Sequence, residues 1–253
     1  MMFSYNRREE IINYLKDRKS ASVEEISKKI YCSPSTVRRD LDQLQKDGRV
    51  RRTRGGVILI EDNHFELPFN FRSFDNYDKK NQIAETAKQL VKEDMTIFID
   101  SSSTCMCLAK KLKPIKNLKV LTNNPLLAYD LSQNTEIETY CVGGRILPKS
   151  CTIQGSTACR FLMQFHSDIV FLGSRGFDVQ KGPTDFSDDS AQIKYFYSIN
   201  STKTVLLIDS TKFNKSYNYS GLDFNMIDTL ITDKQPDVSI SNTCLKHNID
   251  ILY

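Results

Sequence analysis

Four side chains that can bind nucleic acid are predicted to share the exposed face of one short helix: Ser35, Thr36, Arg38 and Arg39. Arginine can read guanine through two hydrogen bonds, and serine or threonine hydroxyls bond either bases or phosphates. The basic run that follows the helix suits contact with phosphates or with the minor groove, through Arg51, Arg52 and Arg54. These residue types in this order favour binding of double-stranded DNA. Which arginines contact bases and which contact phosphates stays open.

Three helices and a hairpin are predicted to position these side chains. The first helix covers residues 7–18, and the second opens at Ser22 with a capping box that Glu25 completes. The third opens at Ser33-Pro34, a hydroxyl N-cap followed by a proline where no N–H donor is needed. It buries three apolar side chains at helical spacing: Val37, Leu41 and Leu44. Residues 49–59 alternate around a glycine pair, so the whole predicts a helix-turn-helix with a wing.

The positive charge of the chain is concentrated in this part. Residues 1–60 hold 14 basic and 8 acidic residues, a net charge of +6, whereas residues 61–253 hold 21 and 23, a net charge of −2. Such an asymmetry favours a polyanionic partner for the N-terminal part. An interaction module whose basic end binds an acidic protein is an alternative that charge alone leaves open.

Composition excludes several other classes of protein. With 253 residues, 40% hydrophobic and 26% charged, the chain is too apolar for a disordered protein. No apolar run approaches the roughly 18–20 residues that span a bilayer, and no secretory signal is visible at the N-terminus. The seven cysteines form no Cys-x-x-Cys pair and the three histidines are isolated, which predicts free thiols and neither a metal nor a cofactor. We therefore expect a cytoplasmic protein.

Strands and helices alternate through the rest of the chain. Residues 61–78 lack periodicity and contain Pro68, so they predict a linker between a domain at residues 1–60 and one at residues 79–253. Strands are predicted at residues 96–99, 119–121, 137–142, 169–172, 204–208, 226–231 and 249–252. Helices are predicted at residues 83–91, 105–112, 126–131, 155–165 and 191–199. This alternation predicts a mostly parallel α/β sheet with helices on both faces.

Polar loops follow the first three of these strands, at the carboxyl ends where parallel sheets bind ligands. The first loop offers hydroxyls and the N–H groups of a helix N-terminus, which suit a phosphate or carboxylate. It consists of Asp100, Ser101, Ser102, Ser103 and Thr104. Candidate ligand contacts in later loops are Thr122, Asn123, Gly143, Gly144, Arg145 and Lys212. Each loop alone fits an ordinary cap or turn, but three in succession favour a shared pocket.

The N-terminal part resembles the signature of DeoR-type bacterial transcriptional regulators, in the run Ser33–Leu41 and in the later residues Leu44, Gly48, Arg52 and Gly55-Gly56. Cys32, Val37 and Arg54 stand where that family typically has valine, isoleucine and histidine. The C-terminal part resembles the DeoR sensor domain, which is related in fold to ribose-5-phosphate isomerases. That likeness rests on residues 80–84, 100–104, 122–123, 143–144, 168–173, 209–213 and 231–233. The resemblance covers residues 5–235.

The resemblance implies a regulator, usually a repressor of carbohydrate genes, whose sensor domain binds a phosphorylated sugar. A dimer or higher homo-oligomer is expected, because helix-turn-helix proteins usually pair half-sites. One departure is Ser102, where the family has glycine. If that glycine is left-handed or lets a phosphate approach the backbone, Ser102 costs about 1 kcal/mol in strain or crowds the ligand. A regulator with a degenerate or differently specific sensor domain is therefore an alternative.

A sugar-phosphate isomerase-like enzyme is a further alternative. The isomerase relatives carry Asp-Gly-Ala-Asp where this chain reads Leu172-Gly173-Ser174-Arg175, so neither carboxylate is present. Losing a general base removes a contribution of roughly 10²–10⁴-fold. We therefore expect no catalytic activity, and Lys212 alone fits anion binding.

Overall fold

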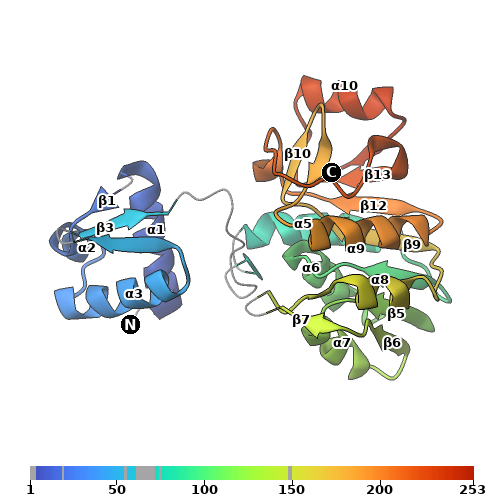
Figure 1. The fold of residues 1–253 in the computed structure, drawn as a ribbon, viewed down its shortest axis with the longest axis horizontal. Helices are drawn as coiled ribbons and strands as arrows, with labels where there is room; N and C mark the ends of the chain where they lie inside the picture. The colour runs from blue at the N-terminus through green and yellow to red at the C-terminus, as the bar shows by residue number, and fades with distance from the viewer. Residues whose placement is uncertain (1–3, 19, 54–55, 61–71, 74–75, 148–149) are drawn as a thin grey trace. The chain divides into compact units, whose positions relative to one another are not determined.

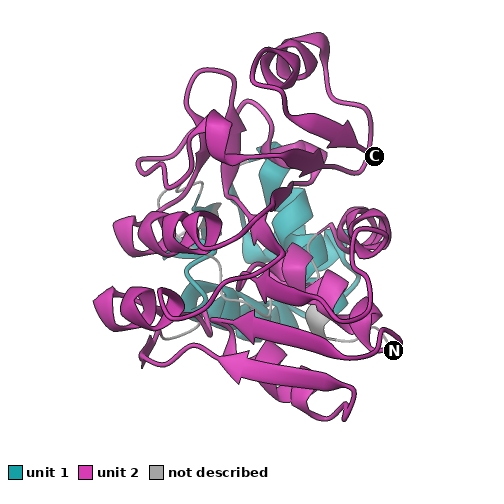
Figure 2. Cartoon of the chain, turned by 90° about the vertical axis from the view of Figure 1, so that its right-hand side faces the viewer, with its two compact units in different colours: residues 1–68 teal, residues 69–253 magenta. Residues whose placement is uncertain are grey.

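The computed structural model of the chain describes residues 4–18, 20–53, 56–60, 72–73, 76–147 and 150–253 (Figure 1). Contacts within the chain divide it into two units, Met1–Pro68 and Phe69–Tyr253 (Figure 2). Most of the predicted linker at residues 61–78 lies outside the described residues. Its last two residues already belong to α5 (Tyr77–Lys88), a helix of the second unit.

The N-terminal unit combines three helices with a three-stranded antiparallel sheet. Its elements are α1 (Ser4–Arg18), β1 (Ser20–Ala21), α2 (Val23–Lys29), α3 (Pro34–Lys46), β2 (Val50–Thr53) and β3 (Gly56–Leu59). Strands β2 and β3 pair antiparallel, which confirms the predicted hairpin. The prediction missed β1, whose short polar sequence carries no strand signal, although it pairs with β3 and completes the sheet.

Hydrogen bonds at the helix starts confirm the predicted caps. Ser22 Oγ accepts from the Glu25 N–H at 3.1 Å, and Glu25 Oε2 accepts from the Ser22 N–H at 2.7 Å. Ser33 Oγ accepts from the Thr36 N–H at 3.3 Å at the start of α3. The apolar face of α3 is fully buried in the core of the unit, as predicted for Val37, Leu41 and Leu44. The opposite face of α3 is therefore left for polar side chains.

Gly56 shows why the wing needs a glycine. A β-carbon at this position would lie 2.3 Å from the carbonyl oxygen of Ala21. Glycine alone lets β3 approach β1 this closely.

The second unit contains a seven-stranded sheet in the order β14-β13-β12-β9-β4-β5-β6. Its strands are β4 (Thr96–Ile99), β5 (Leu118–Thr122), β6 (Ile137–Cys141), β9 (Ile169–Gly173), β12 (Thr204–Leu207), β13 (Thr229–Ile231) and β14 (Asp250–Leu252). Every neighbouring pair in this sheet is parallel, which confirms the predicted α/β class. The carboxyl ends of the strands therefore share one edge of the sheet.

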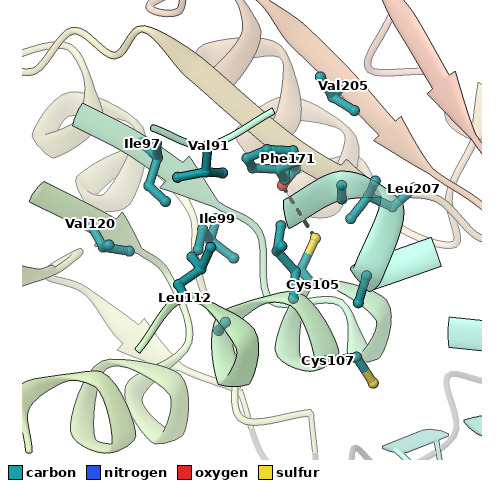
Figure 3. Close-up of a cluster of buried hydrophobic side chains, with 14 of the residues drawn as sticks. Val91, Ile97, Ile99, Cys105, Cys107, Leu112, Val120, Phe171, Val205 and Leu207 are labelled. Atoms are coloured by element: carbon teal, nitrogen blue, oxygen red, sulfur yellow. Dashed lines mark hydrogen bonds between the residues drawn. The ribbon is translucent and has the colours of Figure 1, made fainter. Parts of the chain in front are cut away.

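Helices cover both faces of this sheet (Figure 1). One face packs against α5, α6 (Ser103–Leu112) and α7 (Pro125–Ser132), and the other against α8 (Ser156–Leu162), α9 (Asp188–Ile199) and α10 (Val238–Lys246). Alternate strand residues divide between the two cores, so Ile97 faces the first and Phe98 the second. Figure 3 shows part of the first core, where Cys105 Sγ donates to the carbonyl oxygen of Phe171 at 3.3 Å.

Several elements differ from the prediction. Two hairpins were not predicted, β7 (Arg145–Ile146) with β8 (Ile153–Gln154), and β10 (Gly176–Asp178) with β11 (Gly182–Thr184). Helix α10 was also missed. The strand predicted at residues 226–231 is shorter, because Phe224–Met226 forms a 3-10 turn before β13. In the part of the chain that the structure describes, no helix is long and apolar enough to cross a membrane.

Candidate functional site

The side chains predicted to meet DNA lie in the first half of α3. The hydroxyls of Ser35 and Thr36 each lie 2.9 Å from that of Ser33, so the helix start carries a small group of linked hydroxyls. Arg38 and Arg39 are exposed on the following turn. The guanidinium of Arg38 lies 4.0 Å from the carboxylate of Glu24, and both side chains are more than half exposed. Such a surface pair is weak, so Arg38 stays available to another anion.

The wing arginines differ in how available their charges are. Arg51 is exposed on β2. Arg52 donates a hydrogen bond to Asp42 of α3, so its charge is already paired within the unit. Arg54 lies outside the described residues. Of the two described wing arginines, Arg51 is therefore the one better placed to contact a phosphate.

A partly buried ion pair that the sequence analysis missed joins α1 to α3. The guanidinium of Arg7 donates two hydrogen bonds to the carboxylate of Asp40. Nε donates to Oδ2, and Nη2 donates to Oδ1 at 3.1 Å. Asp40 is 4% exposed, and the hydrogen bond from Arg7 raises the pKa of that guanidinium. Asp40 directly follows the two exposed arginines and directly precedes Leu41. The carboxylate therefore fixes the rotation of α3 about its axis, and with it the direction in which Arg38 and Arg39 point.

In the second unit, Asp100 links the carboxyl ends of two neighbouring strands. It follows β4, and its Oδ1 accepts from the Ser101 N–H at 2.7 Å. Its Oδ2 accepts from the Gly173 N–H at the end of β9, at 3.1 Å. The predicted Asp100–Thr104 loop thus lies beside the loop that leaves β9.

Ser102 is not strained. Its backbone is extended, with φ −69°, and its hydroxyl caps α6 by accepting from the Cys105 N–H at 3.2 Å. The left-handed strain considered for this position does not arise. A β-carbon on Gly173 would lie 2.4 Å from the β-carbon of Ser102, so Ser102 fills the space that Gly173 leaves. Ser103 and Thr104 are buried in the first turn of α6.

Thr122 and Asn123 are committed to bonds within the protein. Asn123 is fully buried, and its Nδ2 donates to the carbonyl oxygen of Ile153 at 3.0 Å. Its Oδ1 accepts from the Tyr197 hydroxyl at 3.3 Å. The hydroxyl of Thr122 accepts from the Asn124 N–H at 3.2 Å. These contacts hold the loop after β5 against β8 and α9.

The loop after β6 lies at a more exposed place. Gly143, Gly144 and Arg145 are all exposed, and the nearest atoms to Gly144 belong to Ile153 and Ala158 rather than to the Asp100 loop. The guanidinium of Arg145 is 73% exposed and lies 3.8 Å from the carboxylate of Asp189. Arg145 is therefore a peripheral cation next to the first turn of α9.

Lys212 lies in a short 3-10 turn after β12 and faces the loop after β9. Its Nζ donates to the carbonyl oxygen of Ser174 at 2.9 Å and lies 3.8 Å from Oδ2 of Asp209. The pKa of Lys212 is lowered to about 8, chiefly by burial. The positive charges of Arg175, Lys80 and Arg72 also lower it, against the opposing charge of Asp209.

These shifts identify a group of cations that the sequence analysis did not assemble, and we call Lys80, Arg175 and Lys212 the cation cluster. Lys80 is buried and its Nζ donates to the carbonyl oxygen of Arg72 at 2.6 Å. Arg175 lies over the ring of Phe186, 5.3 Å from its centroid. The negative charge of Asp209 raises the pKa of Lys212 and so opposes the effect of the other cations. Of the charges that shift the pKa of Lys212, three are positive and one is negative, in a part of the chain whose net charge is −2.

A buried ion pair lies at the same edge. Lys194 Nζ of α9 bonds both carboxylate oxygens of Asp185 at 2.6 Å, and both residues are buried. Burial and the charge of Asp100 raise the pKa of Cys105, and the charge of Lys194 opposes that shift. Lys194 therefore lies close to the Asp100 loop.

Buried polar atoms without a hydrogen-bonding protein partner gather along this edge. They include Thr104 Oγ1 after β4, Asn124 Nδ2 after β5, Asp209 Oδ2 after β12 and Thr232 Oγ1 after β13. Because buried polar atoms are nearly always paired, this is where a polar ligand or water would complete the bonding. Among the described residues, no group of three histidines, cysteines or carboxylates could hold a metal ion.

Comparison with known families divides the chain in a similar way. Residues 7–63 match the family described as a DeoR-like helix-turn-helix domain, and residues 75–234 match the DeoR C terminal sensor domain. The chain is 32% identical over 234 residues to the HTH-type transcriptional regulator GolR of Listeria innocua, covering 92% of both chains. It is 27% identical over 241 residues to the glycerol-3-phosphate regulon repressor of Escherichia coli, covering 95% of both.

Among solved structures, ribose 5-phosphate isomerase A from Methanocaldococcus jannaschii is similar over 55% of each chain, with 18% identity and a TM-score of 0.40.

Proposed function

The chain belongs to the DeoR family of helix-turn-helix transcriptional regulators, and from this premise we propose that it represses carbohydrate-metabolism genes and is released from DNA by a phosphorylated sugar. The proposal assigns DNA binding to residues 1–60, and ligand binding and self-association to residues 79–253. Relatives named as repressors, including the glycerol-3-phosphate regulon repressor, support repression rather than activation. The name of this relative also supports a phosphorylated ligand. The protein would act in the cytoplasm as a dimer or higher homo-oligomer without catalytic activity.

For DNA binding, we assign the major groove to four residues at the start of α3: Ser35, Arg38 and Arg39, which are exposed, and Thr36, which is half-buried. The N-terminal residues of the recognition helix meet base edges in this motif. The wing would contact the backbone through Arg51, Arg52 and Arg54. Arg52 would first exchange its bond with Asp42 for one with a phosphate.

For ligand binding, the observation that carries the proposal is the cation cluster at the carboxyl edge of the sheet. A phosphate monoester carries about −1.5 to −2 charges at pH 7, which the positive charges of the cation cluster would attract. The Asp100–Thr104 loop lies at the same edge, and we assign it the contacts to the sugar. Thr122 and Asn123 would hold the loop after β5 in place beside the site. Gly143, Gly144 and Arg145 would lie at its exposed edge.

The pH dependence of binding tests this assignment. Because the pKa of Lys212 is lowered to about 8, its ammonium is charged at pH 7 and mostly neutral at pH 9. A phosphate monoester is mostly dianionic at pH 7 and gains negative charge toward pH 9, so its own titration does not weaken binding over this range. If the phosphate binds only when the ammonium of Lys212 is charged, its affinity should be about tenfold weaker at pH 9 than at pH 7.

The measurement is thermal stabilisation of the full chain by a panel of pentose, hexose and triose phosphates, followed by titration calorimetry of the best compound at both pH values. Lys212→Arg keeps the charge at both pH values and should flatten the dependence. If no compound stabilises the protein, the sensor assignment is wrong. If a compound binds equally well at both pH values, Lys212 does not hold the phosphate.

A further inference from the structure

Tyr31 is the most exposed large hydrophobic side chain among the described residues, at 94%. It stands in the four-residue connection, residues 30–33, between α2 and α3. Its φ of +52° is left-handed, a conformation that disfavours any residue with a β-carbon and that glycine adopts without penalty. A tyrosine here is therefore unfavourable for the folded unit on two counts, backbone strain and an exposed ring.

The turn cannot relax to relieve Tyr31. The Cys32 N–H donates to the carbonyl oxygen of Ser27 at 3.2 Å, and the Ser27 hydroxyl donates back to the carbonyl oxygen of Cys32. Ser33 then caps α3. Because the side chain is almost wholly exposed, contacts of the ring within the unit do not offset the strain, and the ring is available to another molecule.

The charges around Tyr31 indicate what that molecule is. Residues 26–39 contain four basic residues, Lys28, Lys29, Arg38 and Arg39, and no acidic residue. The lysines end α2 and the arginines lie on the recognition face of α3, so Tyr31 stands between two basic groups. A polyanion is the partner that such a segment attracts.

We propose that Tyr31 contacts DNA when α3 occupies the major groove, its hydroxyl donating a hydrogen bond to a backbone phosphate beside the groove; this rests on the assignment of α3 to the major groove proposed above. The geometry that favours this is its place two residues before the N-cap of the recognition helix, whose N-terminal end lies deepest in the groove. Tyrosine hydroxyls are among the groups that bond phosphate oxygens in protein–DNA complexes. The contact would fix the register of the protein on the duplex without reading sequence.

Tyr31→Phe tests the hydroxyl. The probes are a duplex that the wild-type full-length protein selects from a random pool and an unrelated duplex of equal length. Loss of one hydrogen bond to a charged oxygen predicts about tenfold weaker binding to both duplexes. The slope of log affinity against log salt should stay as in wild type, because no cation is lost. Tyr129→Phe, an exposed tyrosine of α7 in the other unit, is the matched control and should change nothing.

Tyr31→Gly separates a DNA contact from a role in folding. Amide hydrogen exchange of the full-length variant should show protection in α2 and α3 equal to or greater than wild type, because glycine removes the strain. DNA affinity should nevertheless fall at least as far as in Tyr31→Phe. If both variants bind both duplexes as tightly as wild type, Tyr31 does not contact DNA. A loss confined to the selected duplex would overturn the phosphate assignment in favour of base reading.

Discussion

Asp40→Ala should destabilise the N-terminal unit by about 3–5 kcal/mol and abolish DNA binding. Removing the carboxylate leaves the guanidinium of Arg7, which is 16% exposed, without its charge partner between α1 and α3. A unit of this size has a stability of only about 3–9 kcal/mol, so the loss is a large part of it. Urea unfolding of the full chain, followed by hydrogen exchange of peptides from α1 and α3, measures the effect.

Two variants control this prediction. Asp42→Ala removes another carboxylate of α3 that is paired with an arginine, but this pair is exposed and its loss should cost no more than about 1 kcal/mol. Arg7→Leu combined with Asp40→Leu replaces both charges and should recover most of the stability. A cost below about 1 kcal/mol for Asp40→Ala would show that the pair does not hold α3 in place.

Lys194→Met should destabilise the second unit by a similar amount, about 3–5 kcal/mol, because it leaves the buried carboxylate of Asp185 without a counter-ion. Chemical unfolding of the full chain at pH 7.5 measures the effect.

The surface pair between Lys119 and Glu138 supplies the matched control. Both side chains are more than half exposed and their charged atoms lie 3.7 Å apart, so Lys119→Met should have little effect. Lys194→Met combined with Asp185→Leu should restore stability. Equal stability of Lys194→Met and wild type would mean that the ammonium is not what neutralises Asp185.

The elements best predicted from the sequence are those whose signals are local. The capping box at Ser22 and the Ser33-Pro34 start each lie within four residues, and both form as expected. The apolar strands are buried on both faces, which leaves a continuous hydrophobic run that can be recognised without knowing their neighbours. By contrast, β1 is two residues long and exists only because β3 approaches it.

The ligand site is harder to predict from the sequence, because its charged residues lie far apart in the chain and meet only in the folded domain. Lys80 lies more than 130 residues from Lys212 in the sequence, and nothing in either local pattern shows that α5 and the turn after β12 meet at one edge. The pairing of Asp185 with Lys194 depends in the same way on the hairpin that precedes α9. Polar type and loop position do predict Asp100, but they cannot show that Asn123 is already saturated by Ile153 and Tyr197.

The central claim is that a ligand held at the carboxyl edge of the sheet changes the affinity of the helix-turn-helix for DNA. The most direct test is fluorescence anisotropy of the selected duplex with wild-type protein and with Lys212→Ala, each with and without the sugar phosphate that best stabilises the wild type. We expect saturating ligand to weaken wild-type binding by about 5–150-fold, the usual range of allosteric coupling, and to leave Lys212→Ala unchanged. Wild-type affinity that is the same with and without saturating ligand would contradict the account.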